Sequence, residues 1–384
     1  MDIFKGFGCK EDEKELIAAL DDIFFSEEPH NNFMDLLPKL YKDKFNCGER
    51  NLILKEDGVI KAAVGCFPLN AVAAGRKLRI LGIGNVGVAK DCRRKGYMIE
   101  LMNDALAMMM SEDYDYSVLG GQRQRYEYFG YGPAGSALRF EINIGNISRI
   151  RNGNTETSFT AREITEADTD IFAKINELNE AQPYYVVRCE EDMLDILRSW
   201  KCTPCAVFNG GEFKGYFVCG GKGHLSEIRV LDTEDLLDVF LCAMKTMESE
   251  SVAFAAPIYN TALCSYMAKV CCGMSACHVE QINIFNYAKF VEAFLAVKAA
   301  RMNLGCGTLN VLVHGCKKDE NLAITVDGKD VTVTETDAKP DLELSHLEAV
   351  AFFAGQYSEK RFTLPAFAQS WFPVDFFSGQ QDNV

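Results

Sequence analysis

Long apolar runs are missing from this sequence of 384 residues, and its N-terminal stretch MDIFKGFGCKEDEKEL has no basic region followed by an apolar core. A membrane-spanning helix needs about 20 consecutive apolar residues, and a secretory signal peptide needs that N-terminal pattern. We therefore expect a cytoplasmic protein without a transmembrane segment.

Basic residues are also scarce, since 40 lysines and arginines stand against 55 aspartates and glutamates, for a formal net charge of −15. An acidic surface repels the phosphates of nucleic acids and of anionic membranes, and it attracts cations. Nucleic acid and membranes are therefore not expected as partners, whereas a cationic amine is.

A disulfide framework is absent as well, because the fifteen cysteines are odd in number and irregularly spaced. Many lie in apolar segments, which is typical of reduced, buried thiols in a cytosolic protein. The alternative is a metal site in one of two short stretches, whose candidate ligands are Cys202, Cys205, Cys271, Cys272, Cys277 and His278. Neither stretch has the four-ligand spacing of a zinc site, so we expect no metal. The five histidines form no constellation, and no nucleophilic serine or cysteine signature stands out.

The length allows two or three domains, and the pattern of the first 150 residues predicts a mixed α/β unit. KELIAALDDIFF has apolar residues at helical spacing, and two strands follow around an Asp57-Gly58 hairpin turn. The strand RKLRILGIGNVGV then leads into a helix expected over about 94–110. SVLGG predicts a further strand, and QRQRYEYFGYGPAG is expected to continue into an aromatic one.

A second unit, over 151–286, repeats this plan weakly: a Gly-Gly hairpin, then a strand that leads into a helix. Its helix begins at LDTEDLL, an acidic cap that repels anions. The third unit, over 287–384, has a helix, alternating strands around an Asp327-Gly328 turn and a second helix, which indicates a small α+β domain. Its final SWFPVDFFSGQQDNV is aromatic enough that we expect it to dock on the protein.

The stretch VGVAKDCRRKGYMIELM, from Val86 to Met102, places three cations where its helix should begin. The positive end of a helix dipole disfavours cations, by about 0.3–1 kcal/mol each when exposed. A solvated basic turn is one interpretation. The other is an anion site, since Gly96 allows close backbone approach and the second unit lacks these cations. The pattern favours a pyrophosphate as the ligand.

These residues resemble a known signature. Val86 to Val88 followed by RRKGYM is similar to the acetyl-CoA motif of the GNAT superfamily of N-acetyltransferases, with Met98 where many members have Gly or Ala. RYEYFGYGPAG, from Arg125 to Gly135, is similar to a segment of the Eis (enhanced intracellular survival) acetyltransferases. The resemblance implies a mixed α+β fold with an active GNAT domain (1–150), a degenerate one (151–286) and a sterol-carrier-protein-like domain (287–384). It also implies a hexamer.

The resemblance assigns roles to matching positions. Backbone groups of Val86, Gly87 and Val88 are expected to pair with the pantetheine arm of acetyl-CoA. The pyrophosphate is expected to be wrapped by Arg93, Arg94, Lys95, Gly96, Tyr97 and Met98. Tyr126 matches the general acid, and the carboxylate of Val384 stands where the family has its base. The substrate-facing helix and loop contain Phe24, Phe25, Glu27 and Glu28.

Plainer structural roles remain open for some of these residues. Tyr126 fits a packed aromatic in a Tyr-rich strand, the two phenylalanines fit core packing, and the two glutamates fit a solvated acidic loop.

The expected function is N-acetyl transfer from acetyl-CoA, by direct transfer, to a primary amine of a cationic substrate such as an aminoglycoside. Alternatives are a protein-lysine or polyamine acetyltransferase, and a non-catalytic lipid-binding module whose GNAT half is vestigial. The intact cationic turn argues against the last, because a vestigial site is expected to look like LDTEDLL.

Overall fold

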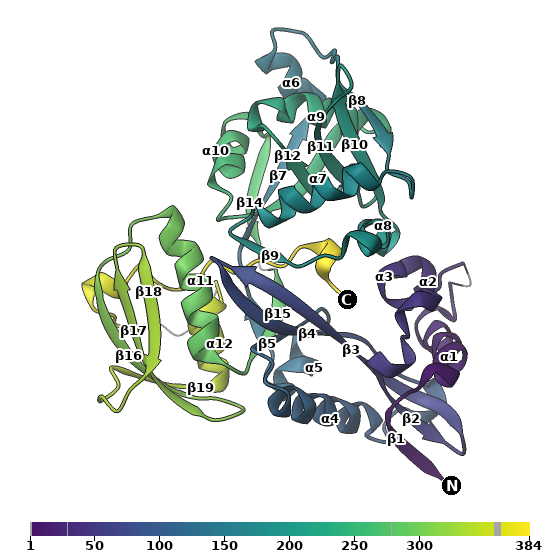
Figure 1. The fold of residues 1–384 in the computed structure, drawn as a ribbon, viewed down its shortest axis with the longest axis vertical. Coiled ribbons are helices and arrows are strands. Elements are labelled where there is room, and N and C mark those ends of the chain that lie inside the picture. Colours follow the sequence, from purple (N-terminus) through teal and green to yellow (C-terminus); the bar gives the residue numbers. More distant parts are fainter. Residues whose placement is uncertain (1, 29, 278, 357–361) are drawn as a thin grey trace.

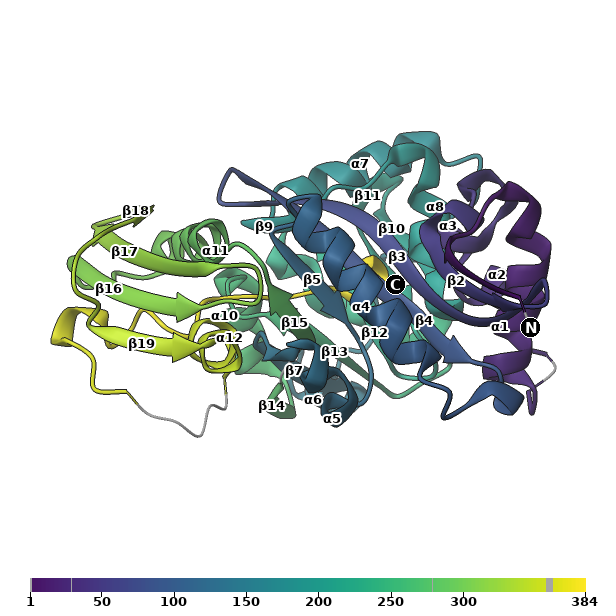
Figure 2. The same ribbon diagram turned by 90° about the horizontal axis from the view of Figure 1, so that it is seen from below.

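The computed structural model describes residues 2–28, 30–277, 279–356 and 362–384. It is a mixed α+β protein, as the sequence predicts, built from three units (Figure 1). The first unit is purple to blue, the second teal, and the third green to yellow. The C-terminus lies between the first two units, and Figure 2 shows the third unit to one side of them.

The first unit is a sheet in the order β1-β2-β3-β4-β5-β15-β6, with β9 added against β3. Its strands are β1 Ile3–Phe7, β2 Asn51–Glu56, β3 Val59–Ala73, β4 Arg76–Val88, β5 Tyr116–Leu119, β6 Gly132–Ala134, β9 Tyr184–Val186 and β15 Glu280–Ile284. Its helices are α1 Glu13–Phe25, α2 Phe33–Leu36, α3 Pro38–Tyr41, α4 Tyr97–Ser111 and α5 Arg123–Tyr126.

Local sequence explains these elements. The predicted hairpin turn joins β2 to β3, with positive φ angles at Asp57 (47°) and Gly58 (83°). Helix α4 buries a stripe of Leu101, Met102 and Ala105 on the sheet. It begins at Tyr97, three residues later than predicted, because the turn before it has left-handed backbone.

Strands β4 and β5 are parallel and pair from Ile80 opposite Tyr116 to Ile83 opposite Leu119. Strand β4 continues to Val88, so its last residues leave β5 and run on along β3 alone. Paired residues of neighbouring strands share a face of the sheet. Past Ile83 and Leu119 the two strands are no longer paired, and we call this region the opening between β4 and β5.

The first two units exchange strands. Strand β7 (Ala137–Asn143), which precedes residue 150, pairs with β13 and β14 of the second unit. Strand β15, which precedes residue 286, lies between β5 and β6 of the first sheet. The sheets thus do not divide at the boundaries expected from the sequence, since long-range pairing of this kind leaves no local signal.

The second unit has a sheet in the order β12-β11-β10-β8 and another in the order β13-β7-β14. Its other strands are β8 Thr160–Glu163, β10 Thr203–Asn209, β11 Glu212–Cys219, β12 Leu225–Val230, β13 Ser251–Pro257 and β14 Gly273–Cys277. Its helices are α6 Ile144–Ile150, α7 Thr169–Glu180, α8 Met193–Arg198, α9 Leu236–Thr246 and α10 Thr261–Val270. The predicted acidic cap precedes α9, where the Asp232 side chain accepts a hydrogen bond from the Glu234 amide at 2.9 Å.

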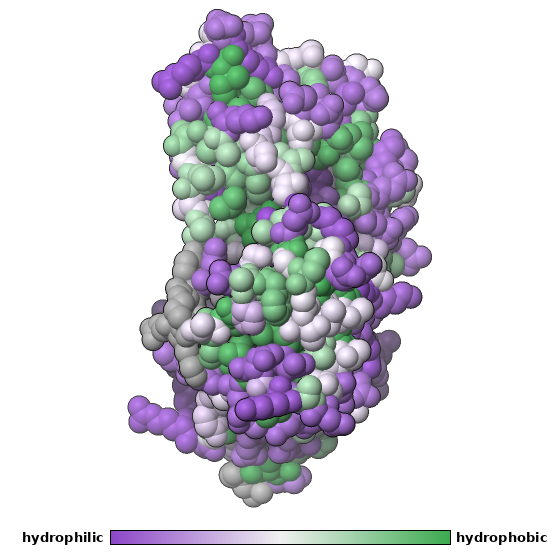
Figure 3. Space-filling view, turned by 90° about the vertical axis from the view of Figure 1, so that its left-hand side faces the viewer, coloured by the Kyte–Doolittle hydropathy of each residue, from purple (hydrophilic) through white to green (hydrophobic). Residues whose placement is uncertain are grey.

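The third unit is a sheet in the order β18-β17-β16-β19, packed against two helices. Its elements are α11 Tyr287–Arg301, β16 Gly307–His314, β17 Asp319–Asp327, β18 Asp330–Glu335, β19 Leu342–Ser345 and α12 His346–Ala354. The predicted Asp327-Gly328 turn joins β17 to β18. The face of the molecule that this unit occupies mixes hydrophilic and hydrophobic residues (Figure 3).

The C-terminal segment docks, as predicted. Trp371 and Phe376 are fully buried, and the Trp371 indole donates a hydrogen bond to the Gly305 carbonyl at 3.0 Å. Phe376 packs on Phe294 of α11 with ring centroids 5.3 Å apart. From there the chain runs between the first two units to Val384 (Figure 1).

Candidate active site

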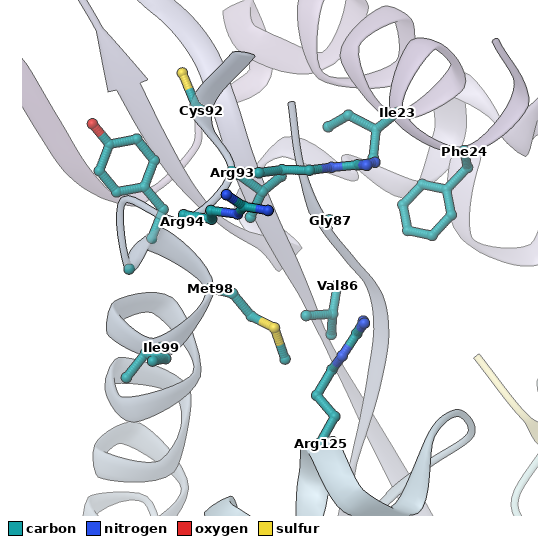
Figure 4. A pocket seen from close by; sticks show the side chains of 13 residues that line it. Ile23, Phe24, Val86, Gly87, Cys92, Arg93, Arg94, Met98, Ile99 and Arg125 are labelled. Atoms are coloured by element: carbon teal, nitrogen blue, oxygen red, sulfur yellow. The ribbon is translucent and has the colours of Figure 1, made fainter. Parts of the chain in front are cut away.

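A cavity of about 690 Å³ opens at the turn between β4 and α4 (Figure 4). Its walls come from the end of α1, the end of β4, the turn, the first turn of α4, and α5. The lining residues are Ile23, Phe24, Val86, Gly87, Val88, Cys92, Arg93, Arg94, Gly96, Tyr97, Met98, Ile99 and Arg125. It contains most of the positions that the sequence assigns to the cofactor.

Backbone conformation holds the turn outside the helix. Arg94 has a φ of 70° and Gly96 a φ of 89°, both left-handed. Such a φ strains residues other than glycine, which explains a glycine at 96. As the N-cap of α4, Gly96 offers no side chain to accept from the first amides of the helix. Those amides remain at the cavity wall, where an anion can accept their hydrogen bonds.

Three arginines surround this helix start. The side chains of Arg93 and Arg94 cross the cavity from the turn, and that of Arg125 reaches toward Val86 from α5 (Figure 4). The sequence prediction included Arg93 and Arg94 but missed Arg125. Arg125 could have been found from its position directly before Tyr126 in QRQRY. Guanidinium groups bind phosphate through paired hydrogen bonds, so the cavity suits a polyanion.

Lys95, the third predicted cation, does not line the cavity. Its ammonium donates to Glu56 at 2.6 Å, and the Tyr97 hydroxyl also donates to that carboxylate. Hydrogen bonds from Lys95 and Tyr97 hold the pKa of Glu56 below its usual value, and the same contact with Glu56 raises the pKa of Lys95. The side chain of Lys95 thus points away from the cavity and fixes the turn to Glu56 of β2.

The end of β4 offers backbone groups to the cavity. Asn85, with a φ of 42°, interrupts the ladder to β3, and the register shifts between Ala63 and Gly65. The Asn85 side chain accepts from the Tyr41 hydroxyl at 2.5 Å and donates to Asn51 at 2.8 Å. This bulge re-aims the strand just before Val86, Gly87 and Val88, which all line the cavity.

The predicted substrate-facing residues separate into two groups. Phe24 lines the cavity and packs on Gly87, where an added Cβ would lie 2.8 Å from its ring. Phe25 instead packs on Phe33 at 5.2 Å between centroids, within an apolar cluster. Glu27 and Glu28 are exposed beyond α1, and Glu28 accepts from Asn31.

Tyr126 lies on the short helix α5, whereas the sequence predicted a strand there. Its side chain is buried between α4 and the sheet and packs on Tyr131 at 6.5 Å between centroids. Its ring also lies against Gly121, just beyond β5, where an added Cβ would be 2.9 Å away. Burial raises the pKa of the Tyr126 phenol, and neighbouring Arg125 opposes the rise. The hydroxyl therefore keeps its proton at neutral pH.

Val384 reaches the opening between β4 and β5. Its side chain lies 2.5 Å from where a Cβ on Gly82 would stand, and its carboxyl carbon 3.1 Å from the same point on Gly84. Glycines at 82 and 84 thus make room for the end of the chain. A second cavity, of about 190 Å³, lies beside it between the first two units, and Lys39, Phe67 and Arg188 are among its lining residues.

Ion pairs and hydrogen bonds fix this tail. Arg188, which is fully buried, donates to Asp382 at 2.8 and 3.0 Å and to Glu227 at 2.9 and 2.7 Å. The Lys39 ammonium donates to the carbonyls of Gln381 and Asn383, both at 2.6 Å. Burial lowers the pKa of Lys39 to about 7. The tail therefore holds the first two units together at the site.

The cationic turn and the tail lie on opposite faces of the first sheet. Gly82, Val118 and Ile282 are paired across β4, β5 and β15, so they share the face on which Val384 packs. Leu81, Ile83 and Leu119 occupy the other face, in one apolar cluster with α4 and Tyr126. The end of β4 borders both places, since Val86 to Val88 line the cavity and Gly84 lies against Val384.

All fifteen cysteines are free thiols, and Cys202 and Cys205 are both buried. His278, one of the candidate metal ligands, lies outside the described residues. Across the described ranges, no three His, Cys, Asp or Glu side chains gather as a metal site would require. The helices described here are all too short or too polar to cross a membrane.

Comparison with known proteins agrees with this geometry. Residues 9–134 match the family model of the acetyltransferase (GNAT) domain. Among curated protein sequences, none matches at a significant level. Among solved structures, a conserved protein of unknown function from Enterococcus faecalis V583, described as a probable N-acyltransferase, has a TM-score of 0.66 at 16% identity, covering 92% of this chain and 90% of its own.

Two further solved structures share the fold over almost the whole chain. A GCN5-related N-acetyltransferase from Anabaena variabilis has a TM-score of 0.63 at 16% identity, covering 91% of this chain and 89% of its own. Eis1 from Mycobacterium abscessus has a TM-score of 0.61 at 15% identity, with the same coverage. The chain therefore has an Eis-like overall fold and carries, over residues 9–134, a GNAT acetyltransferase domain, which makes it an acyltransferase.

Proposed function

We propose that this protein transfers an acetyl group from acetyl-CoA to a primary amine of a cationic substrate. One observation carries the proposal: Arg93, Arg94 and Arg125 converge on an uncapped helix start beside the free end of β4. The helix amides and guanidinium groups suit the pyrophosphate of acetyl-CoA. The backbone of Val86 to Val88 suits the amides of its pantetheine arm.

The thioester would then lie in the opening between β4 and β5, with the amine entering from the face that holds Val384. The amine nitrogen forms a bond to the thioester carbon, and a backbone amide at the end of β4 stabilises the developing oxyanion. The nitrogen loses its surplus proton to water as the C–S bond breaks. The CoA thiolate takes the proton of the Tyr126 hydroxyl, and the phenolate regains a proton from water. A free thiol has a pKa of about 8.5, so a phenol is an adequate acid for this step.

The carboxylate of Val384 lies on this face, beside Gly84. A terminal carboxylate has a reference pKa of about 3.3–3.7, so it is a weak base at neutral pH. We assign it to holding the ammonium group in place, or to accepting its proton through water. The net charge of −15 favours the approach of such a substrate.

Aminoglycosides, polyamines and protein lysines all offer such amines. We favour a small polycationic acceptor of the aminoglycoside kind, and a polyamine or a lysine side chain is the second candidate. For the third unit we propose that it is the sterol-carrier-protein-like domain that the resemblance implies. Assembly as a homo-oligomer, a cytoplasmic location, and the absence of nucleic acid or membrane partners are part of the same proposal.

Release of free CoA thiol from acetyl-CoA tests this function, measured with kanamycin, spermidine and a lysine peptide as acceptors. We expect amine-dependent release and an acetylated amine in the mass spectrum of at least one product. A chain shortened by Asp382 to Val384 is expected to keep acetyl-CoA binding and lose transfer. Binding of acetyl-CoA without transfer to any of the three amines would contradict the proposed acceptor class.

A further inference from the structure

Glu280 is a carboxylate at the site for which neither the sequence motifs nor the proposed function has a role. It is the first residue of β15, the strand that the second unit contributes to the first sheet. Strand β15 lies between β5 and β6, with Gln281 opposite Leu119 and Glu280 opposite Ala134. Glu280 therefore lies level with the end of β5, where the opening to β4 begins.

The register places Glu280 on the acceptor face. Ile282 shares a face with Val118 and Gly82, and Glu280, two residues earlier on the same strand, shares the face of Ile282. Val384 packs on this face, against Gly82 and Gly84. Gln281 points to the opposite face and donates to the Gly121 carbonyl at 2.8 Å, beside the ring of Tyr126.

A hydrogen bond connects Glu280 directly to the tail. The Asn383 side-chain amide donates to its carboxylate at 2.6 Å. Asn383 is held in turn by the Ser378 hydroxyl, at 2.6 Å, and through its carbonyl by Lys39. Glu280 is partly buried, so a small group can still reach the carboxylate.

The surroundings of Glu280 leave it without a counter-ion among the described residues. On the neighbouring strand β6, Ala134 lies opposite it, and Gly120 follows the end of β5. From the tail, Asp382 is bound by Arg188, and the Lys39 ammonium donates to the Asn383 carbonyl. Burial raises the pKa of Glu280 to about 7, against a partial lowering by its hydrogen bonds. A carboxylate tuned close to neutral pH is a far better proton acceptor than an ordinary one.

We propose that Glu280 is the group that takes the proton from the acceptor amine; this rests on the proposed acetyl transfer. An N–H bond of the ammonium breaks, its proton passes to a Glu280 oxygen, and the freed lone pair forms the N–C bond to the acetyl carbon. Glu280 passes this proton to water and is free to accept the second surplus proton of the nitrogen once the N–C bond has formed. As the C–S bond breaks, the leaving thiolate takes its proton from Tyr126, and the phenolate regains a proton from water. Asn383 and the carboxylate of Val384 position the amine.

The test compares wild type with Glu280→Gln, Glu280→Asp and the control Glu141→Gln, an exposed glutamate of β7. Thiol release is measured from pH 5.5 to 9.5 with kanamycin, spermidine, a lysine peptide and trifluoroethylamine. The fluorines keep trifluoroethylamine unprotonated at neutral pH, so it needs no base before attack. Calorimetry with acetyl-CoA and thermal melts check that each variant binds the donor and folds.

With a protonated acceptor we expect E280Q to lower kcat/KM at pH 7 by about 100-fold or more, the usual contribution of a general base. The acid limb of the wild-type pH profile, centred near pH 7, is expected to vanish in E280Q. With trifluoroethylamine as the acceptor, kcat/KM of E280Q is expected to fall by less than about fivefold, since this amine needs no deprotonation before attack. E280D should recover part of the activity, and E141Q should match wild type.

Two results would overturn the inference while leaving the proposed function intact. One is that E280Q keeps wild-type turnover and the same pH limb. The other is that it loses activity equally with protonated and unprotonated amines, which marks a structural role. If wild type binds acetyl-CoA but acetylates no amine, the proposed function itself fails, and the role of Glu280 fails with it.

Discussion

The carboxyl carbon of Val384 lies 3.1 Å from the point where a Cβ on Gly84 would stand, at the place where β4 leaves β5. No side chain larger than a hydrogen fits there without moving the end of the chain. Gly82 and Gly84 of β4 therefore make room for the protein's own tail.

Replacing Gly84 with alanine is expected to displace the end of the chain by a few tenths of an ångström and to lower kcat by about 10-fold, since misplacement by about 1 Å costs about 100-fold in other sites. Acetyl-CoA affinity should remain, because the donor cavity is on the other face. Steady-state kinetics and calorimetry measure the two effects. Gly6→Ala is the matched control, since its Cβ would meet only the Phe4 ring, at 3.4 Å. Unchanged kcat in Gly84→Ala would contradict a role for the tail.

The arginines and the lysine near the turn should differ in their effect on donor binding. Arg125→Gln removes a cation that lines the cavity, so acetyl-CoA is expected to bind about 10-fold or more weakly, the value of one charge-assisted hydrogen bond. Lys95→Gln removes a cation bound to Glu56 and should weaken binding less. Titration calorimetry compares the two, and a larger loss in Lys95→Gln would contradict the placement of these side chains.

Tyr126→Phe removes the proposed acid and keeps the ring that packs on Tyr131 and Gly121. We expect kcat to fall by about 100-fold or more, with unchanged melting temperature and donor affinity. Because burial raises the phenol pKa, wild-type activity should persist through pH 9, where an ordinary phenol begins to lose its proton. Full activity in the phenylalanine variant would return Tyr126 to a packing role.

Arg188→Met is expected to destabilise the protein by about 3–5 kcal/mol, because it leaves Glu227 and Asp382 buried without their cation. Burial raises the pKa of Glu227, but Arg188, with Arg229 and Tyr216, outweighs it and holds this pKa at about 2, below its usual 4.5. A lowered folded-state pKa stabilises the protein above the unfolded value, and that stability is lost as pH falls from about 4.5 toward 2. Urea titrations of wild type should show this loss. If the Arg188→Met variant is as stable as wild type at pH 7, the pairing of Arg188 with Glu227 and Asp382 is contradicted.

Local sequence predicted much of the site. The cations at 93 and 94, just before a helix, favoured an anion site over a solvated turn, and the aromatic residues at 371 and 376 indicated a docked tail. Lys95 could not be separated from its neighbours, since Glu56, which binds it, lies on another strand. At Arg125 and Tyr126 the sequence predicts a strand where the structure has a helix, because a helix of four residues is too short to show a helical pattern.

Glu280 and the exchange of β7 and β15 escaped prediction for a different reason. Strand β15 joins a sheet whose other strands lie far from it in sequence, and nothing in its own residues specifies that partner. The same holds for Arg188, whose partners Glu227 and Asp382 are 39 and 194 residues away. The acceptor half of the site depends on these long-range pairings, whereas the donor half is one continuous stretch of chain.

The most direct test of the account is acetyl-CoA binding to wild type and to the double variant Arg93→Gln, Arg94→Gln, measured by titration calorimetry at low and high salt. We predict one site per chain in wild type, affinity that falls with salt, and a loss of about 100-fold or more in the double variant. Absence of binding to wild type, or equal affinity once both cations are neutralised, would contradict the assignment of this cavity to the acetyl donor.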